Sequence, residues 1–324
     1  MNDRKVLVTS RSFGKGAAAP LQLLESKGYR VVRYPAEAES LVDWLKRELV
    51  DADGVIAGLE PYPAELIQSC VKLKVISRYG VGYDKVDLEA AHNQGIAVTN
   101  TPGANSDSVA DMAFALMLSC ARFIPLLDAC IRRSEHKTAV GHGLWGKTIG
   151  IIGTGSIGKG VAKRAAGFNM RILCSDMYPD EAFAQQVGAT YTDLDTMLAE
   201  ADFISIHAPY NEQTHNMFDK AAFARMKSTA ILVNTARGGI IDEDALYDAL
   251  SKGQIAAAGL DVTVAEPPFG SPLLALDNVI VTPHMAANTY DAILNMGMMA
   301  SQNLIDILET GSSRFCVNAM KSAQ

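Results

Sequence analysis

The chain has 324 residues, of which 48% are hydrophobic and 20% charged, so it can bury a large core and is not a disordered chain. Its 29 basic and 36 acidic residues leave a net charge of −7, which disfavours a general nucleic-acid-binding protein because such proteins need clustered Lys and Arg. No apolar run of about 18 residues and no signal-peptide core is present. We therefore expect a cytoplasmic protein of two domains with no membrane and no nucleic-acid partner.

Cysteine and histidine spacing gives no sign of a metal centre. The five cysteines form no C-x-x-C pair, and the six histidines form no H-E-x-x-H array. Cys120 and Cys174 lie in apolar stretches and are predicted to be small core residues. No metal is expected.

The first hundred residues alternate short apolar runs with helical patterns. Strands are predicted at residues 5–9, 29–33, 54–57, 75–77 and 96–99, and helices near 17–27, 39–48 and 64–69. Continuous apolar strands alternating with helices indicate a parallel sheet that is covered on both faces. The turn-rich segment 100–103 then predicts a domain boundary.

A long apolar helix is predicted over residues 105–131, followed by an exposed loop over 132–143. A second series of strands follows at 148–152, 171–175, 203–206, 230–234, 256–260 and 279–281, and a last helix at about 289–309. The predicted fold class is α/β, with two doubly wound parallel-sheet domains.

A glycine-rich turn follows the first strand of the second series and opens a helix. It contains G-x-G-x-x-G at Gly153, Gly155 and Gly158. The first glycine permits a tight turn, the second lets the backbone approach a pyrophosphate, and the third lets the helix pack close to the strand. The N–H groups at the start of the helix favour phosphate. The motif therefore predicts a dinucleotide-binding site.

Asp176 ends the next strand, 18 residues after the third glycine. A carboxylate there accepts hydrogen bonds from the adenosine ribose and repels a 2′-phosphate, and neither Met177 nor Tyr178 supplies a guanidinium. We expect NAD as the cofactor, with NADP disfavoured. The structural alternative is that Asp176 only caps a helix at 180–187.

Three polar segments follow later strands of this series, where the carboxyl ends of parallel strands line a crevice. They are 234–239 with Arg237, 261–267 with Asp261 and Glu266, and 282–284 with His284. An Arg can bind a carboxylate through two parallel hydrogen bonds, and a His beside a carboxylate can exchange protons near neutral pH. Each residue alone has a structural explanation, but their order behind a dinucleotide motif favours catalysis.

These motifs resemble those of the D-isomer-specific 2-hydroxyacid dehydrogenases. Residues 76–84 resemble that family's substrate loop, and 100–111 its crossing between domains. The resemblance implies a flavodoxin-like substrate domain, residues 1–101 plus 288–324, and a Rossmann cofactor domain, residues 102–287, with an interdomain cleft. It also implies a homodimer built largely on residues 105–143.

The resemblance implies a role for each matched residue. Arg237 would bind the substrate carboxylate and the C2 oxygen, His284 would donate a proton to that oxygen as hydride reaches C2, and Glu266 would orient the imidazole. Asp261 would hold the nicotinamide carboxamide, and His207 lies near the cofactor without an assigned role. The substrate would also be bound by Arg78, Val81 and Gly82, and the dinucleotide contacted by Ser156, Ile157, Ala208, Pro209, Thr235, Ala236 and His284.

The implied reaction is hydride transfer between a nicotinamide and C2 of a small D-2-hydroxyacid or 2-oxoacid, either 3-phosphoglycerate-like or of the hydroxypyruvate and glyoxylate type. Arg78 matches a phosphate-binding Arg of the phosphoglycerate dehydrogenases, but Glu60 stands in the loop where they carry a second Arg. Glu60 would repel a phosphate if it faces the cleft, and Arg78 could instead bind another tail or hold the loop. Two other functions stay open, reduction of an imino acid and a non-catalytic NAD(H)-sensing corepressor role.

Overall fold

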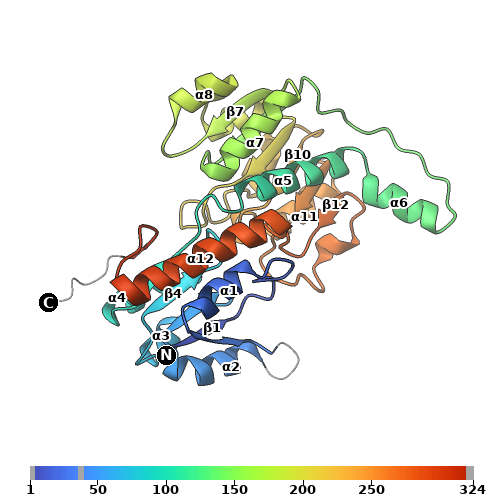
Figure 1. Ribbon diagram of the computed structural model, residues 1–324. Coiled ribbons are helices and arrows are strands. Elements are labelled where there is room, and N and C mark those ends of the chain that lie inside the picture. Colours follow the sequence, from blue (N-terminus) through green and yellow to red (C-terminus); the bar gives the residue numbers. More distant parts are fainter. Residues whose placement is uncertain (1–3, 36–39, 319–324) are drawn as a thin grey trace. The chain divides into compact units, whose positions relative to one another are not determined.

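The computed structural model describes residues 4–35 and 40–318 and divides into two compact units (Figure 1). Unit 1 comprises residues 1–105 and 288–324, and unit 2 comprises residues 106–287. Each unit has its own all-parallel sheet with helices on its faces, of five strands in unit 1 and seven in unit 2. The predicted fold class, two parallel-sheet α/β domains, is confirmed.

The sheet of unit 1 has the strand order β2-β1-β3-β4-β5. This order reverses between β1 and β3, which is the point where open α/β sheets bind ligands. The strands are β1 Lys5–Val8, β2 Arg30–Arg33, β3 Gly54–Ala57, β4 Val75–Arg78 and β5 Ala97–Thr99, and the helices are α1 Ala19–Ser26, α2 Leu41–Glu48, α3 Ala64–Gln68, α4 Leu88–Asn93 and α12 Tyr290–Thr310, with a 3-10 turn η1 at Leu49–Asp51.

Unit 1 buries its central strands on both faces, which explains their continuous apolar runs. All residues of β1, β3 and β4 are buried, and α12 packs on β3, β4, β5 and α1. The sequence did not predict α4, a short helix that Asp87 begins by accepting a hydrogen bond from the N–H of Ala90 at 2.8 Å. The predicted start of α2 at residue 39 lies outside the described residues, and Ser40 caps the helix there.

The sheet of unit 2 has the strand order β12-β11-β10-β9-β6-β7-β8, with its reversal between β6 and β9. The strands are β6 Thr148–Ile152, β7 Arg171–Ser175, β8 Ala189–Tyr191, β9 Phe203–Ile206, β10 Ile231–Asn234, β11 Ala257–Leu260 and β12 Val279–Val281. The helices are α5 Ser106–Ala121, α6 Ile124–Arg132, α7 Ser156–Gly167, α8 Glu181–Val187, α9 Leu194–Glu200, α10 Lys220–Arg225 and α11 Glu243–Ser251, with 3-10 turns η2 Gly238–Ile240 and η3 Pro272–Ala275.

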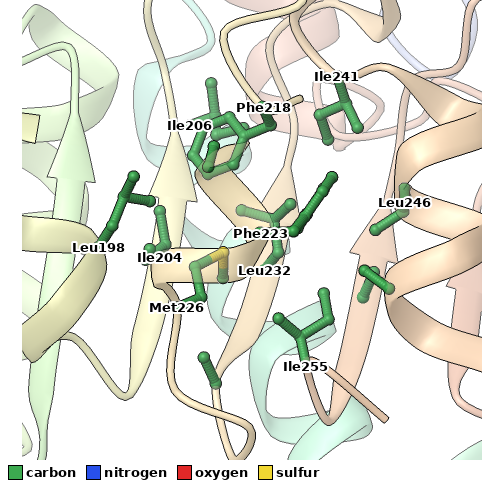
Figure 2. Close-up of a cluster of buried hydrophobic side chains, with 14 of the residues drawn as sticks. Leu198, Ile204, Ile206, Phe218, Phe223, Met226, Leu232, Ile241, Leu246 and Ile255 are labelled. Atoms are coloured by element: carbon green, nitrogen blue, oxygen red, sulfur yellow. The ribbon is translucent and has the colours of Figure 1, made fainter. Parts of the chain in front are cut away.

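Two apolar clusters hold this sheet, one on each side. Figure 2 shows the first, in which Leu198 of α9 and Leu246 of α11 pack with Ile204 of β9 and Leu232 of β10. The second joins the strands to α5 and α7 and contains Cys120 and Cys174. Burial raises the pKa of Cys120 to about 12 and that of Cys174 to about 11, so both thiols stay protonated and the prediction of core cysteines is confirmed.

The predicted single helix over 105–131 is wrong, because the chain breaks it into α5 and α6. Phe123 takes a left-handed φ of 55° between them, and Pro125 stands in the first turn of α6. Among the described residues no single helix is long and apolar enough to cross a membrane, and only α5 and α6 together, bent by 61°, reach that length and composition. The following segment is irregular, as predicted, and residues 131–140 are all exposed.

Candidate active site

The glycine-rich turn between β6 and α7 leaves space that a dinucleotide phosphate fits. Gly153 has a φ of +86°, and a Cβ there would lie 2.6 Å from the backbone nitrogen of Ala208. A Cβ on Gly158 would lie 2.0 Å from the carbonyl oxygen of Gly153, whereas one on Gly155 would meet no atom within 4 Å. The first and third glycines thus permit close packing of the backbone, and the second faces open space at the start of a helix.

The remaining predicted dinucleotide contacts lie along the same sheet edge. Ser156 and Ile157 begin α7, directly after the glycine turn. Because β9 lies between β6 and β10, the residues that follow β9 are neighbours of this turn, and those that follow β10 lie one strand further along the same edge. Those residues are Ala208, Pro209, Thr235 and Ala236.

Asp176 is fixed by the glycine turn itself. One carboxylate oxygen accepts the N–H of Thr154 at 2.5 Å and its hydroxyl at 3.0 Å, and the other accepts the N–H of Tyr178 at 2.8 Å. Burial alone would raise the pKa of Asp176, but these hydrogen bonds lower it below its ordinary value. The alternative role as a helix cap is wrong, because Asp180 caps α8. A fixed anion therefore stands beside the turn.

His207, which follows β9, is held as a neutral imidazole. Its Nε2 lies 2.8 Å from the Ser205 hydroxyl and its Nδ1 lies 3.4 Å from the Thr235 hydroxyl. Burial lowers the pKa of His207 to about 3, so it carries no charge near neutral pH. It therefore supports the turn that carries Thr235 and cannot serve as a cationic acid.

The loop that carries Arg237 is closed by Asn234 at the end of β10. The fully buried Asn234 accepts the N–H of Ala236 at 2.9 Å and donates to the carbonyl of Arg237 at 2.8 Å. The Arg237 guanidinium also donates to the carbonyl of Ala236 at 2.7 Å. The position of Arg237 at this sheet edge is therefore set by its own short loop.

His284 and Glu266 form the pair that the sequence predicted. Nδ1 of His284 lies 3.0 and 3.2 Å from the two carboxylate oxygens of Glu266, and the side chains are 23% and 27% exposed. The carboxylate holds Nδ1, so Nε2 is the nitrogen left for a substrate. This is the geometry of a general acid or base with an orienting carboxylate.

Asp261 clamps the loop that carries His284. Its carboxylate accepts the Thr282 hydroxyl at 2.6 Å and the N–H groups of Met285 and Ala286 at 2.8 Å each, while its backbone carbonyl accepts the N–H of His284 at 2.8 Å. Asp261 is 1% exposed, and His284 has a left-handed φ of 55°, a conformation that costs about 1–3 kcal/mol. The clamp thus holds His284 in a strained conformation. The sequence did not predict it, and the contact with the carboxamide stays a prediction.

The predicted substrate residues of unit 1 surround the end of β4. Arg78 is 3% exposed and donates from its guanidinium to the carbonyls of Gly58 and Gly82, the latter at 3.1 Å. The carbonyl of Val81 accepts the side-chain amide of Asn100 at 2.8 Å. Within the described residues no hydrogen bond uses the N–H of Val81 or Gly82, and their binding of an anion stays a prediction.

Comparison with known proteins agrees with this geometry. Residues 114–286 match the family model described as the D-isomer specific 2-hydroxyacid dehydrogenase, NAD binding domain, and the chain is 43% identical over 263 residues to a glyoxylate reductase of Korarchaeum cryptofilum, covering 79% of each. The chain belongs to the D-isomer specific 2-hydroxyacid dehydrogenase family. NAD is its cofactor, and its reaction is the oxidoreduction of 2-hydroxyacids.

Other members of this dehydrogenase family show the range of its named activities. The chain is 45% identical to a D-3-phosphoglycerate dehydrogenase of Archaeoglobus fulgidus, in a match that spans 79% of this chain but only 49% of that protein. The crystal structure of the TT0316 protein from Thermus thermophilus superposes with a TM-score of 0.87 at 36% identity, covering 97% of this chain and 99% of that one. Because the relatives are named for different activities, the substrate of this dehydrogenase has to be inferred from the residues of this chain.

Proposed function

We propose that this chain interconverts a small 2-oxoacid of the glyoxylate or hydroxypyruvate type and its D-2-hydroxyacid, with His284 as the acid and base. The observation that carries the proposal is the His284–Glu266 pair on a loop that Asp261 clamps. A structural histidine has no need of a strained backbone and a buried carboxylate beneath it. Strain concentrated at a histidine on the same sheet edge as a dinucleotide turn is typical of a catalytic group.

Bound NADH supplies the hydride that reaches C2 of the oxoacid. In the proposed mechanism the guanidinium of Arg237 binds the substrate carboxylate and polarises the C2 oxygen. His284 donates the proton on Nε2 to that oxygen, so that the carbonyl gains one hydride and one proton and becomes a hydroxyl. Glu266 accepts the hydrogen bond of Nδ1 throughout and stabilises the protonated imidazole before the transfer. In the reverse direction His284 removes the hydroxyl proton.

We further propose that the chain divides into a substrate domain, residues 1–101 plus 288–324, and a cofactor domain, residues 102–287. The N–H groups of Val81 and Gly82 would bind the substrate carboxylate as an anion-binding turn.

We also propose a homodimer formed by α6 and the segment that follows it. These elements project from unit 2 (Figure 1), and Ile131 is 66% and Val140 96% exposed. Exposed apolar side chains on one projecting segment favour an interface between copies. Sedimentation equilibrium should give twice the chain mass, and Ile131→Asp should shift it toward the monomer.

We propose that the enzyme works in the cytoplasm. Its cysteines are free in the described part of the chain, and four of the five are buried, as expected of a protein kept in a reducing compartment.

The proposal is tested by following NADH absorbance with glyoxylate, hydroxypyruvate, pyruvate and phosphohydroxypyruvate, each with and without ammonia. We expect turnover of unphosphorylated oxoacids in the absence of ammonia. Turnover only in the presence of ammonia would indicate imine reduction instead. NADH binding with no turnover of any substrate would indicate a sensor.

A further inference from the structure

Glu60 lies where a ligand of unit 1 is expected to bind. The strand order of unit 1 reverses between β1 and β3, and the crevice at such a reversal lies beyond the carboxyl ends of the two strands. Thr9 follows β1, and the loop from Gly58 to Glu60 follows β3. Glu60 therefore lies at the edge of the unit 1 sheet where the strand order predicts that a ligand binds.

The carboxylate of Glu60 is held by one of its two oxygens. Oε1 accepts the Thr9 hydroxyl at 2.5 Å, the Tyr62 hydroxyl at 2.8 Å and the N–H of Gly58 at 3.0 Å. The residue is 9% exposed. Burial and the neighbouring Glu60 charge raise the pKa of Tyr62 well above its ordinary value, so the phenol stays a donor. Three donors that converge on one oxygen fix the side chain in a single position.

The second oxygen of Glu60 is not used in this network. Within the described residues no hydrogen bond reaches Oε2. A Cβ placed on Gly58 would lie 2.8 Å from Oε2, so a side chain at residue 58 would crowd this oxygen. Glu60 thus presents a fixed carboxylate oxygen that has no donor among the described residues and is free to accept a hydrogen bond from a ligand.

The guanidinium of Arg78 lies near this carboxylate, but it already donates hydrogen bonds to backbone carbonyls. Both Glu60 and Arg78 act on the Tyr62 phenol, and the Arg78 guanidinium donates to the carbonyls of Gly58 and Gly82. Arg78 therefore holds the two loops together. Because these donors are directed to backbone carbonyls, they do not form a site for a phosphate beside Glu60, and one Glu60 acceptor stays open.

We propose that Glu60 is a specificity-determining residue that selects a hydroxyl group on C3 of the substrate and excludes a phosphate there. Oε2 accepts the hydrogen bond of the C3 hydroxyl, and the carboxylate repels a phosphorylated tail. This inference rests on the proposed function and narrows its substrate class to 2-oxoacids with a hydroxymethyl tail, such as hydroxypyruvate.

The test compares kcat/KM for four substrates, with glyoxylate as the reference that has no C3. In the unaltered enzyme we expect hydroxypyruvate to exceed pyruvate by at least about tenfold, because the open acceptor is satisfied only by a hydroxyl. Phosphohydroxypyruvate should be the poorest of the four. In Glu60→Gln the ratio of phosphohydroxypyruvate to hydroxypyruvate should rise about tenfold or more. Glu65→Gln, which removes the same charge from an exposed position of α3, should leave the ratio unchanged.

A second variant of Glu60 separates the effect of its charge from the effect of the position of its oxygen. Glu60→Asp keeps the charge but withdraws the oxygen, so the preference for hydroxypyruvate over pyruvate should fall while phosphohydroxypyruvate stays poor. If Glu60→Gln does not fold, as judged by circular dichroism, the Asp variant and the substrate order of the unaltered enzyme decide the matter. The role of Glu60 would be refuted, and the proposed function left standing, by either of two results. One is a folded Glu60→Gln variant whose ratio of kcat/KM for phosphohydroxypyruvate to that for hydroxypyruvate is unchanged. The other is phosphohydroxypyruvate as the best substrate of the unaltered enzyme. Absence of turnover with every oxoacid would instead overturn the proposed function on which it rests.

Discussion

Replacing Asp261 with Asn tests whether the clamp beneath His284 supports catalysis. The carboxylate accepts three hydrogen bonds from the loop, from Thr282, Met285 and Ala286. Asn keeps one acceptor oxygen and turns an NH₂ group toward a donor, so one or two of the three bonds are lost. At about 1.5–3 kcal/mol for each bond to a charged group, the free energy of unfolding should fall by about 1.5–6 kcal/mol.

In Asp261→Asn the catalytic rate should fall by more than the loss of folding stability explains, because His284 loses its fixed position. A displacement of about 1 Å of a catalytic group can cost roughly 100-fold, so we expect kcat/KM to fall by that order. Denaturant unfolding, steady-state rates and NADH binding by fluorescence measure the three effects. Asp277→Asn is the matched control, because its side chain is 77% exposed in the same unit.

Two results would refute this reasoning. A folded Asp261→Asn variant with kcat/KM within about threefold of the unaltered enzyme, far from the roughly 100-fold loss expected of a displaced catalytic group, would show that the clamp is dispensable. A variant that weakens NADH binding but keeps kcat at saturation would assign Asp261 to the carboxamide alone.

Three further predictions follow from the site. Glu266→Gln should lower kcat by about 10–100-fold with a changed pH profile, since the amide cannot stabilise a protonated imidazole; an unchanged profile would separate Glu266 from the chemistry. Asp176→Asn should raise the kcat/KM of NADPH relative to NADH by about tenfold, because the repulsion of a 2′-phosphate is removed, and an unmoved ratio would contradict this. The pKa of His207 is depressed to about 3 when folded and near 6.5 when unfolded, so its stabilisation is complete above about pH 6.5 and is lost as pH falls toward 3. Denaturant unfolding at about pH 7 and pH 4 should therefore show about 3 kcal/mol more acid destabilisation in the unaltered enzyme than in His207→Gln, whereas equal losses would mean that His207 is not held neutral.

Most of the sheet structure could be predicted from sequence because its strands are buried on both faces. The runs at β6, β7, β9 and β12 are mostly apolar, and their predicted limits agree with the structure. The sequence did not predict β8, Ala189–Tyr191, because this short edge strand, Ala-Thr-Tyr, has no run of branched apolar residues. The equally short edge strand β12 could be predicted because its sequence is Val-Ile-Val. The break at Phe123 was also missed, although Pro125 two residues later was an available signal.

The site residues could be named from spacing and resemblance, but their supporting contacts could not. The hydrogen bonds of Asp261 join segments that follow β11 and β12, so they depend on the pairing of these strands. The network of Glu60 likewise joins the ends of β1 and β3, which α1, β2 and α2 separate along the chain. Sequence spacing does not encode such pairings.

The most direct test of the account is the rate of NADH oxidation with hydroxypyruvate by the unaltered enzyme and by His284→Ala. If His284 is the proton donor, the unaltered enzyme turns over and the kcat of the variant falls by at least about 100-fold, with NADH still bound. A His284→Ala variant that keeps kcat within about tenfold of the unaltered enzyme, less than general acid catalysis contributes, would contradict this role.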